Sequence, residues 1–256
     1  MLDSLLVNRG SRTLMVSFHG ALDRKRYSVP RFERLRSLTK YRVNSLYFSD
    51  PSLHIDPSLE LSWFTGWKGV NVHRDMATWI AVTAEALGSD RVVLTGSSGG
   101  GFAALMVGSY IPDSVVITYS PQVDIRLYEA AGKYPHAAKR SYIRHVWPEL
   151  ARGQDLAKFD FAQKWDESIE ERTSAVARYR QPRDTQILFV SNTRDTHHHQ
   201  VHLPALREAL GDDPHRFQLL SYAGPAGHHP PGPTEFERGL ERAAQWAGFD
   251  LPSAGH

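Results

Sequence analysis

The sequence contains no cysteine in its 256 residues, which excludes disulfide bonds and thiolate chemistry. It also lacks a strong excess of either charge, because 30 lysine and arginine residues face 28 aspartate and glutamate residues. That balance gives no reason to expect nucleic acid as a partner. No apolar run approaches the length of a membrane span, and the first residues, MLDSLLVNRGSR, do not resemble a signal peptide. We therefore expect a cytoplasmic protein.

Apolar and aromatic residues are plentiful, at 41% and 11%, so the chain can bury a substantial core. Strand-like and helix-like segments alternate along it. The expected strands are 13–18, 43–48, 92–94, 114–119, 185–190 and 216–222, and the expected helices are 31–38, 72–87, 102–107, 203–210 and 234–247. We place a cap at Thr234 for the last helix, with Glu237 three residues on. This alternation predicts one α/β domain over residues 1–256, with a mainly parallel sheet between helices.

One segment interrupts the alternation. Residues 124–184 contain helical pieces such as AKRSYIRHVWPEL but no convincing strand. We interpret the segment as a helical insertion between two strands. It could form a cap over a site, or it could consist of ordinary surface helices with solvated charges.

The stretch RVVLTGSSGGGFAALM, residues 91–106, places two serines and four glycines between two apolar runs. The first run is typical of a buried strand and the second of a buried helix. Gly96, Ser98 and Gly100 match the pattern G-x-S-x-G, in which a serine lies on a sharp strand-to-helix turn. The pattern predicts Ser98 as a nucleophile and Ser97 as a small neighbour. A phosphate-binding loop is less well supported, because neither G-K-[ST] nor G-x-G-x-x-G is present.

Two further strand ends carry the residues that a reactive serine requires. Asp195 follows the strand 185–190, and His228 lies in AGPAGHHPPGP after the strand 216–222. A histidine can remove the proton from the serine hydroxyl, and a carboxylate can orient the ring. Because the carboxyl ends of parallel strands meet at one edge of a sheet, we expect Ser98, Asp195 and His228 to lie together. Asp124 and His229 remain alternatives for the acid and the base.

In these motifs the sequence resembles the α/β-hydrolase family, over about residues 12–248. The resemblance implies an oxyanion hole formed by two backbone N–H groups. One would come from Gly99, and the other from Gly20 or Ala21 in SFHGALD, whose His19-Gly20 resembles the family's His-Gly loop. The loop lacks the run of three glycines found in many lipases and esterases.

Other aromatic and histidine-rich stretches are weaker candidates. His19, Trp63 and Trp67 could contact substrate, although LSWFTGWKG could equally be a loop pinned to the core by its tryptophans. His198 and His202, four residues apart, could share a metal ion, but no third ligand at a suitable spacing supports a metal site. A solvated loop or substrate-facing histidines are the interpretation that we favour for THHHQVH. Asp50 is expected to bond a nearby turn.

These residues predict a serine hydrolase that cleaves a carboxylic ester through an acyl-serine intermediate, with no metal or organic cofactor. The loops SFHGALDRKRYSVPRF and TYSPQVDI are also similar to hydrolase-fold proteins of bacterial surface-polysaccharide synthesis. That resemblance implies a second possibility, an O-acyltransferase that passes an acyl group to a glycan or another alcohol, and the basic run 24–26 could meet an anionic substrate. A third is a hydrolase-fold protein that only binds. The partner expected in the first two cases is a small-molecule ester or an acylated glycan.

Overall fold

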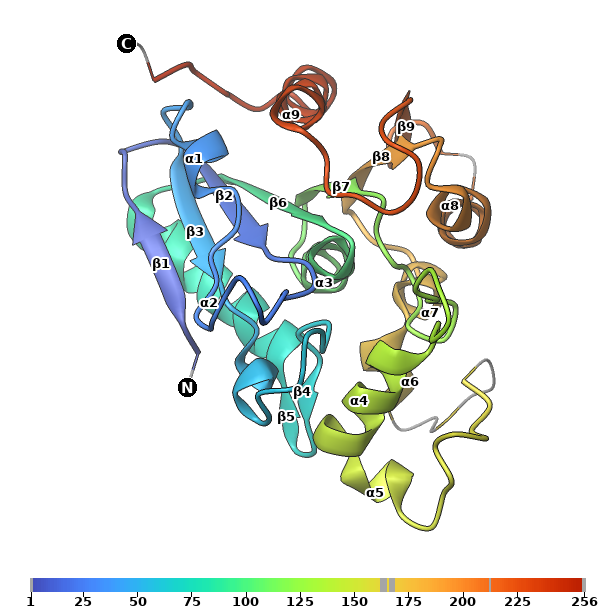
Figure 1. Cartoon of the computed structure of the whole chain (residues 1–256). Coiled ribbons are helices and arrows are strands. Elements are labelled where there is room, and N and C mark those ends of the chain that lie inside the picture. Colours follow the sequence, from blue (N-terminus) through green and yellow to red (C-terminus); the bar gives the residue numbers. More distant parts are fainter. Residues whose placement is uncertain (1, 162–164, 166–168, 212, 255–256) are drawn as a thin grey trace.

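The computed structural model describes residues 2–161, 165, 169–211 and 213–254. Its main sheet has seven strands in the order β1-β3-β2-β6-β7-β8-β9, and all neighbours are parallel except β1 and β3 (Figure 1). The strands are β1 (Ser4–Val7), β2 (Thr13–Phe18), β3 (Asn44–Phe48), β6 (Arg91–Ser97), β7 (Val115–Tyr119), β8 (Gln186–Asn192) and β9 (Phe217–Tyr222). A separate hairpin joins β4 (Gly66–Trp67) and β5 (Val70–Asn71). The predicted mainly parallel sheet is confirmed.

Helices cover both faces of this sheet (Figure 1). Helices α2, α3 and α8 lie on one face, and α9 lies on the other. The helices are α1 (Leu35–Leu38), α2 (Val72–Leu87), α3 (Gly99–Gly108), α4 (Ala137–Val146), α5 (Pro148–Ala151), α6 (Glu170–Thr173), α7 (Ala175–Tyr179), α8 (Leu203–Leu210) and α9 (Pro233–Ala247). The described residues also contain a 3-10 turn at Pro51–His54 and a π-helical turn at His198–His202.

Alternate residues of each central strand enter two separate cores. In β6, Leu94 packs toward α2 and α3, whereas Val93 packs toward Phe236 and Leu240 of α9. Successive side chains of a strand point to opposite faces, so a strand that is apolar throughout requires cover on both sides. This requirement explains the uninterrupted apolar runs of the sequence.

Some elements differ from the sequence-based expectation, and three of the differences have a local cause. The helix expected at 31–38 is only the short α1, because Arg34 takes a left-handed backbone (φ 68°) just before it. Helix α9 begins at Pro233 with Gly232 as its N-cap, so the cap predicted at Thr234 is wrong. Proline suits the first helical turn, where its missing N–H leaves no bond unmade. Strand β1 was not expected, because it is a four-residue edge strand with mostly exposed side chains.

The insertion 124–184 lies between β7 and β8 and contributes α4 to α7. Its described residues contain no strand beyond the isolated bridge between Asp124 and Ser174, and residues 162–164 and 166–168 lie outside them. Helix α7 packs on the core, where the Tyr179 hydroxyl donates to the Leu105 carbonyl of α3 (2.9 Å). Helix α4 instead reaches the loop before β4, where Tyr142 packs edge-on against Trp63. The insertion thus contacts α3 through α7 and the loop with Trp63 through α4. Its role as a cap stays a prediction.

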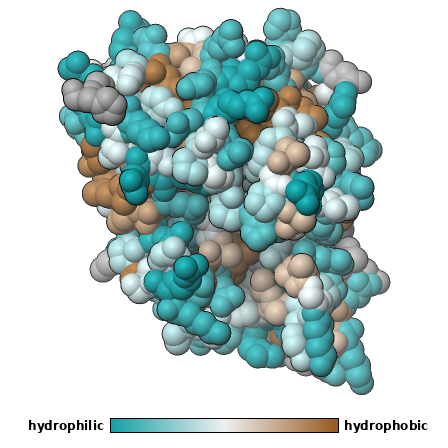
Figure 2. Space-filling view, turned by 45° about the horizontal axis from the view of Figure 1, so that its top comes forward, coloured by the Kyte–Doolittle hydropathy of each residue, from teal (hydrophilic) through white to brown (hydrophobic). Residues whose placement is uncertain are grey.

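The face of the molecule in Figure 2 is largely hydrophilic, and its apolar areas are small and separate. Within the part of the chain that the structure describes, no helix has the length and apolar character needed to cross a membrane.

Candidate active site

The candidate nucleophile lies on the sharp turn between β6 and α3. Ser98 has a positive φ of 56° with ψ −123°, a strained conformation for a residue with a side chain. It is held there by its own N–H, which donates to the Tyr119 carbonyl at the end of β7 (3.1 Å). The turn therefore presents the Ser98 hydroxyl at the carboxyl edge of the sheet, ahead of the N-terminus of α3.

The glycines around Ser98 are required by close approach of the backbone. A Cβ atom at Gly96 would clash with the Gly100 carbonyl, and one at Gly100 would clash with the carbonyls of Phe18 and His19 on the neighbouring strand. These obstacles are backbone atoms, which cannot move aside as a side chain can. The glycine-rich sequence thus allows β2, β6 and α3 to meet at the turn.

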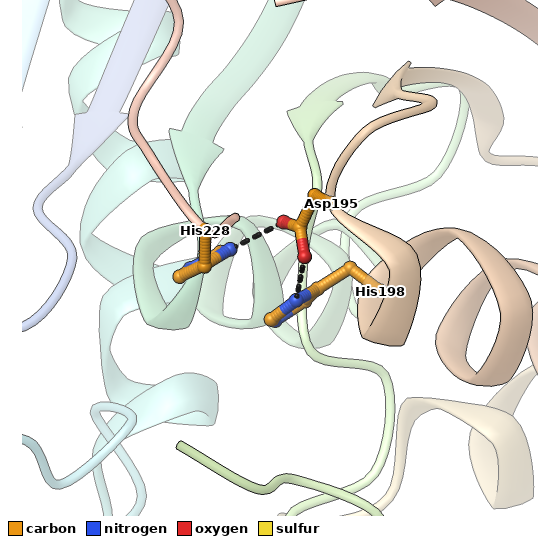
Figure 3. A group of neighbouring side chains, drawn as sticks. All are labelled: Asp195, His198 and His228. Carbon is orange, nitrogen blue, oxygen red and sulfur yellow. Dashed lines mark hydrogen bonds and ion pairs between the residues drawn. The ribbon is translucent and has the colours of Figure 1, made fainter. Parts of the chain in front are cut away.

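The structure brings the predicted Asp195 and His228 to this turn. His228 Nε2 lies 2.7 Å from Ser98 Oγ, and His228 Nδ1 lies 2.6 Å from Asp195 Oδ2. Figure 3 shows the second of these bonds, with the His228 loop and the Asp195 loop facing each other. The order of contacts is that of a nucleophile, a base and an orienting acid.

The loops that carry Asp195 and His228 are tied together by Asn192, the last residue of β8. Its side-chain amide donates to the Pro225 carbonyl (2.8 Å) and its side-chain oxygen accepts from the Gly224 N–H (2.9 Å). The Gly227 N–H also donates to the Arg194 carbonyl (3.0 Å), with Gly227 at a positive φ of 89°. These bonds place the His228 loop over the acid. Asn192 was not among the predicted site residues, and its only signal in the sequence is its place at a strand end.

The carboxyl group of Asp195 is 4% exposed and accepts from two histidines. Burial favours its neutral form, but the hydrogen bonds from His198 and His228 outweigh burial and hold the pKa of Asp195 well below its ordinary value. Asp195 is therefore a carboxylate throughout the neutral and mildly acidic range.

His198 is the second partner of Asp195, and it is buried and not solvated as a loop residue would be. His198 Nδ1 lies 3.0 Å from Asp195 Oδ1, and its ring stacks on that of His228 with centroids 3.8 Å apart (Figure 3). Neither His198 nor His202 lies in a solvated loop, because both are buried. Burial lowers the pKa of His198 to about 4, so the ring is neutral at pH 7.

Gln122, which was not among the predicted site residues, also lies beside Ser98. Its side-chain nitrogen lies 3.0 Å from Ser98 Oγ and 2.8 Å from His198 Nε2, and its oxygen accepts from Trp63 Nε1 (3.3 Å). The available signal was its position shortly after β7, at the same edge of the sheet as Ser98.

His19, Trp63 and Trp67, the residues predicted to contact substrate, mainly pack within the protein or bond its loops. His19 is buried, with Nδ1 on the Gly20 carbonyl (2.7 Å) and Nε2 accepting from the Asp50 N–H (3.0 Å). Trp63 is fully buried, so its interpretation as an open substrate wall is wrong. Trp67 is half-buried, packs against the main core, and its carbonyl accepts from Arg172 (3.0 Å).

The loop with Trp63 is held by Asp50, as expected of a residue that bonds a nearby turn. Its carboxylate accepts from the Ser62 hydroxyl (2.7 Å), the Phe64 N–H (2.7 Å) and the Ser52 N–H (3.0 Å). These bonds stabilise a loop in which Trp63 and Phe64 both have positive φ.

The backbone donors expected for an oxyanion hole are only partly free. Gly99 is the first residue of α3, so its N–H has no carbonyl within the helix to bond. The Gly20 N–H, however, already donates to the Glu33 carboxylate (3.0 Å). Of the two alternatives Gly20 and Ala21, the hydrogen bond to Glu33 disfavours Gly20 and leaves Ala21.

The alternative acid and base lie in other surroundings. Asp124 accepts from Arg126 through both carboxylate oxygens (2.6 Å to Nη2 and 3.0 Å to Nε). His229 is exposed and contacts the Ala226 carbonyl of its own loop (3.1 Å). Among the described residues, the histidine that bonds both Ser98 and Asp195 is thus His228, and not His229.

Asp195, His198 and His228 also offer one ligand atom each within 4.8 Å of one another, which is a spacing suited to a metal ion. In the hydrogen-bonded arrangement, both Nδ1 atoms carry hydrogens that point at the carboxylate. A metal ion would have to displace both hydrogens, so the donor set fits a proton network better than a metal site. The pair His198 and His202 is no better suited to a metal ion, because both ring nitrogens of His198 are already bonded, one to Asp195 and the other to Gln122.

A family model described as "Putative esterase" matches residues 53–243, which is most of the chain. No curated protein sequence matches the chain.

Among solved structures, the capsule O-acetyltransferase of Neisseria meningitidis serogroup A is 14% identical, with a TM-score of 0.59 over 96% of this chain and 91% of that chain. A protein described as a putative dienelactone hydrolase from Klebsiella pneumoniae is 11% identical, with a TM-score of 0.54 over 97% and 99%. Dipeptidyl peptidase 4 of Porphyromonas gingivalis is 17% identical, with a TM-score of 0.61 over 97% of this chain and 34% of that chain. At such identities the likeness establishes the fold alone.

The mainly parallel sheet flanked by helices, the serine turn between β6 and α3, and the match over residues 53–243 lead to one assignment. The chain belongs to the esterase family and has the α/β-hydrolase fold.

Proposed function

We propose that this protein is a serine esterase that cleaves a carboxylic ester through an acyl-serine intermediate. Ser98 attacks the ester carbonyl, His228 takes the hydroxyl proton and returns it to the leaving alcohol, and Asp195 orients His228. Water then releases the acid by the same route. The observation that carries the proposal is the pair of short contacts from Ser98 Oγ to His228 Nε2 (2.7 Å) and from His228 Nδ1 to Asp195 Oδ2 (2.6 Å).

The negative charge that develops on the substrate oxygen needs hydrogen-bond donors. We assign the Gly99 N–H and the Ala21 N–H to this role, because the Gly20 N–H is engaged by Glu33. The N-terminus of α3 adds a favourable dipole at the same point. None of these steps uses a metal ion or an organic cofactor.

A second candidate function is the transfer of the acyl group to an alcohol, such as a glycan hydroxyl, in place of water. It is favoured by the similarity of fold to a capsule O-acetyltransferase. The basic run at 24–26 supports it less than expected, because Arg24 is committed to the carbonyls of Leu59 (2.8 Å) and Leu53 (2.7 Å). In either case we propose a small-molecule ester or an acylated glycan as substrate, without nucleic acid, and a cytoplasmic location.

Intact-protein mass spectrometry after mixing with a panel of activated esters tests the proposal. We expect an acyl adduct on the native protein that decays with release of the acid. Faster decay on adding a sugar alcohol, with an acylated sugar as product, would identify a transferase. A native protein that forms no adduct, hydrolyses no ester and resists a fluorophosphonate probe would instead be a binding protein, and the proposal would fail.

Asp195→Asn is expected to lower kcat by about 10⁴-fold, the typical cost of this change in a serine-histidine-aspartate site. Asparagine offers one oxygen where Asp195 offers two, so His198 or His228 must turn to its other tautomer. The matched control is Asp124→Asn, which weakens the ion pair with Arg126. It should leave kcat within about threefold, because Asp124 bonds Arg126 and not His228. Steady-state kinetics on one ester compares them, and a larger loss in Asp124→Asn would move the acid to the neighbouring strand.

A further inference from the structure

Five side chains form a closed ring of hydrogen bonds around the candidate nucleophile. The ring runs from Ser98 to His228, Asp195, His198 and Gln122 and returns to Ser98. Its five distances lie between 2.6 and 3.0 Å. The proposed mechanism uses three of these residues, and Gln122 and His198 are left without a role.

The orientation of the Gln122 amide is fixed by its neighbours. The Trp63 indole nitrogen can only donate, so the Gln122 atom that faces it is the oxygen. The Gln122 NH₂ group then faces Ser98 Oγ and His198 Nε2, and each of its two hydrogens has one acceptor. Gln122 is fully buried, so a rotated amide would leave polar atoms unpaired away from water.

The hydrogens of the two histidines follow from the same bonds. His198 Nε2 accepts from Gln122, so the ring proton of neutral His198 is on Nδ1, which donates to Asp195. Ser98 Oγ accepts from Gln122, so its own hydrogen is directed to His228 Nε2. Each polar atom in the ring has one role, and no two donors face each other.

We propose that Gln122 is a further catalytic residue, whose side-chain N–H donates to Ser98 Oγ, and that His198 is a positioning residue that holds this amide in orientation from Asp195. This inference rests on the proposed function of Ser98 as the nucleophile. It assigns the second oxygen of Asp195 to the alignment of Gln122, while the first oxygen orients His228.

The N–H of Gln122 has its effect when the acyl-serine breaks down. His228 takes a proton from the attacking water or alcohol as its oxygen bonds to the acyl carbon. The bond from that carbon to Ser98 Oγ then breaks, and His228 returns the proton to Oγ. A donor already facing Oγ stabilises the negative charge that develops on it, as donors at an oxyanion do.

The kinetic test replaces Gln122 with the isosteric but apolar methionine. We expect Gln122→Met to lower kcat by roughly 10- to 100-fold, the range for losing one hydrogen bond to a charged group, with KM changed less than about threefold. The acyl adduct should persist longer in mass spectra. The control is His199→Gln. His199 lies beside His198 in the π-helical turn but bonds Ser191, so this variant should keep native kcat. A native kcat in Gln122→Met would overturn the inference.

Two substitutions of His198 separate positioning from packing. The amide of His198→Gln can supply an acceptor near the former Nε2 position, whereas that of the shorter His198→Asn reaches only the Nδ1 position. We expect His198→Gln to keep more of kcat than His198→Asn, and His198→Asn to add no further loss in a Gln122→Met background. Equal losses in His198→Gln and His198→Asn would contradict a role through Gln122. Additive losses in the double variant of His198→Asn and Gln122→Met would contradict it as well.

A measurement without substrate keeps this inference distinct from the proposed function. In ¹H–¹⁵N spectra of histidine-labelled native protein at pH 7, we expect His198 as the neutral Nδ1–H tautomer. Gln122→Met should shift its Nε2 resonance. The opposite tautomer would overturn the ring of bonds whether or not the protein turns over esters. Failure of the native protein to form any acyl adduct would remove the proposed function, and with it the catalytic role of Gln122.

Discussion

Ser98→Ala is expected to abolish ester turnover, lowering kcat by about 10⁶-fold, as the loss of the nucleophile does in related chemistry. The methyl group of alanine cannot form the acyl intermediate, although the oxyanion donors remain. The variant should also lose labelling by a fluorophosphonate probe. Because alanine must adopt the same positive φ as Ser98, circular dichroism should verify that the fold is retained.

Ser97→Ala is the matched control for this substitution. Ser97 is the last residue of β6, is 6% exposed and precedes the turn, so it does not share the geometry of Ser98. We expect near-native turnover and full labelling. Similar losses in the two variants would refute the assignment of Ser98.

His228→Ala is expected to have the second large effect, a loss of about 10⁶-fold in kcat, because a histidine base and a serine nucleophile act as a unit. It should also remove the pH dependence of kcat/KM. In the native protein, activity should rise with pH, since only a neutral His228 can accept the proton of Ser98.

The pH profile between pH 5 and 8 should contain a single limb. The pKa of Asp195 lies below this range, and burial lowers the pKa of His198 to about 4, so neither group changes its charge there. One uncharged ester, measured with native protein, His228→Ala and the control His229→Ala, gives the comparison. A flat native profile, or a normal limb in His228→Ala, would exclude His228 as the base.

Much of the fold could be predicted from local patterns. The apolar runs of β6 and β7 indicated strands buried on both faces, and the glycines beside Ser98 indicated a tight turn. Both signals are local, because they follow from the backbone freedom of glycine and from the two-residue period of a strand. The N-cap of α9 was predicted two residues late, because Thr234 and Glu237 resemble a capping box, whereas Gly232 is the N-cap and Pro233 begins the helix.

The site was predictable to the extent that strand ends meet at one edge of a parallel sheet. That rule placed Ser98, Asp195 and His228 in the same region from their order alone. It could not predict which face of each loop turns inward. His198 and Trp63 illustrate this limit, because both lie in polar or flexible stretches of sequence and both are buried.

The sequence by itself therefore determined the class of the fold, the serine turn and the set of residues at the carboxyl edge, since each depends on neighbours in the chain. Only the tertiary structure decided the contacts between them. The bonds that join Gln122 to Ser98 and His198 link residues 24 and 76 positions apart. They depend on how the loop after β7 packs between Trp63 and the turn that carries His198 after β8. A donor and an acceptor must meet within about 3 Å to bond, and no pattern of adjacent residues specifies that distance across three loops.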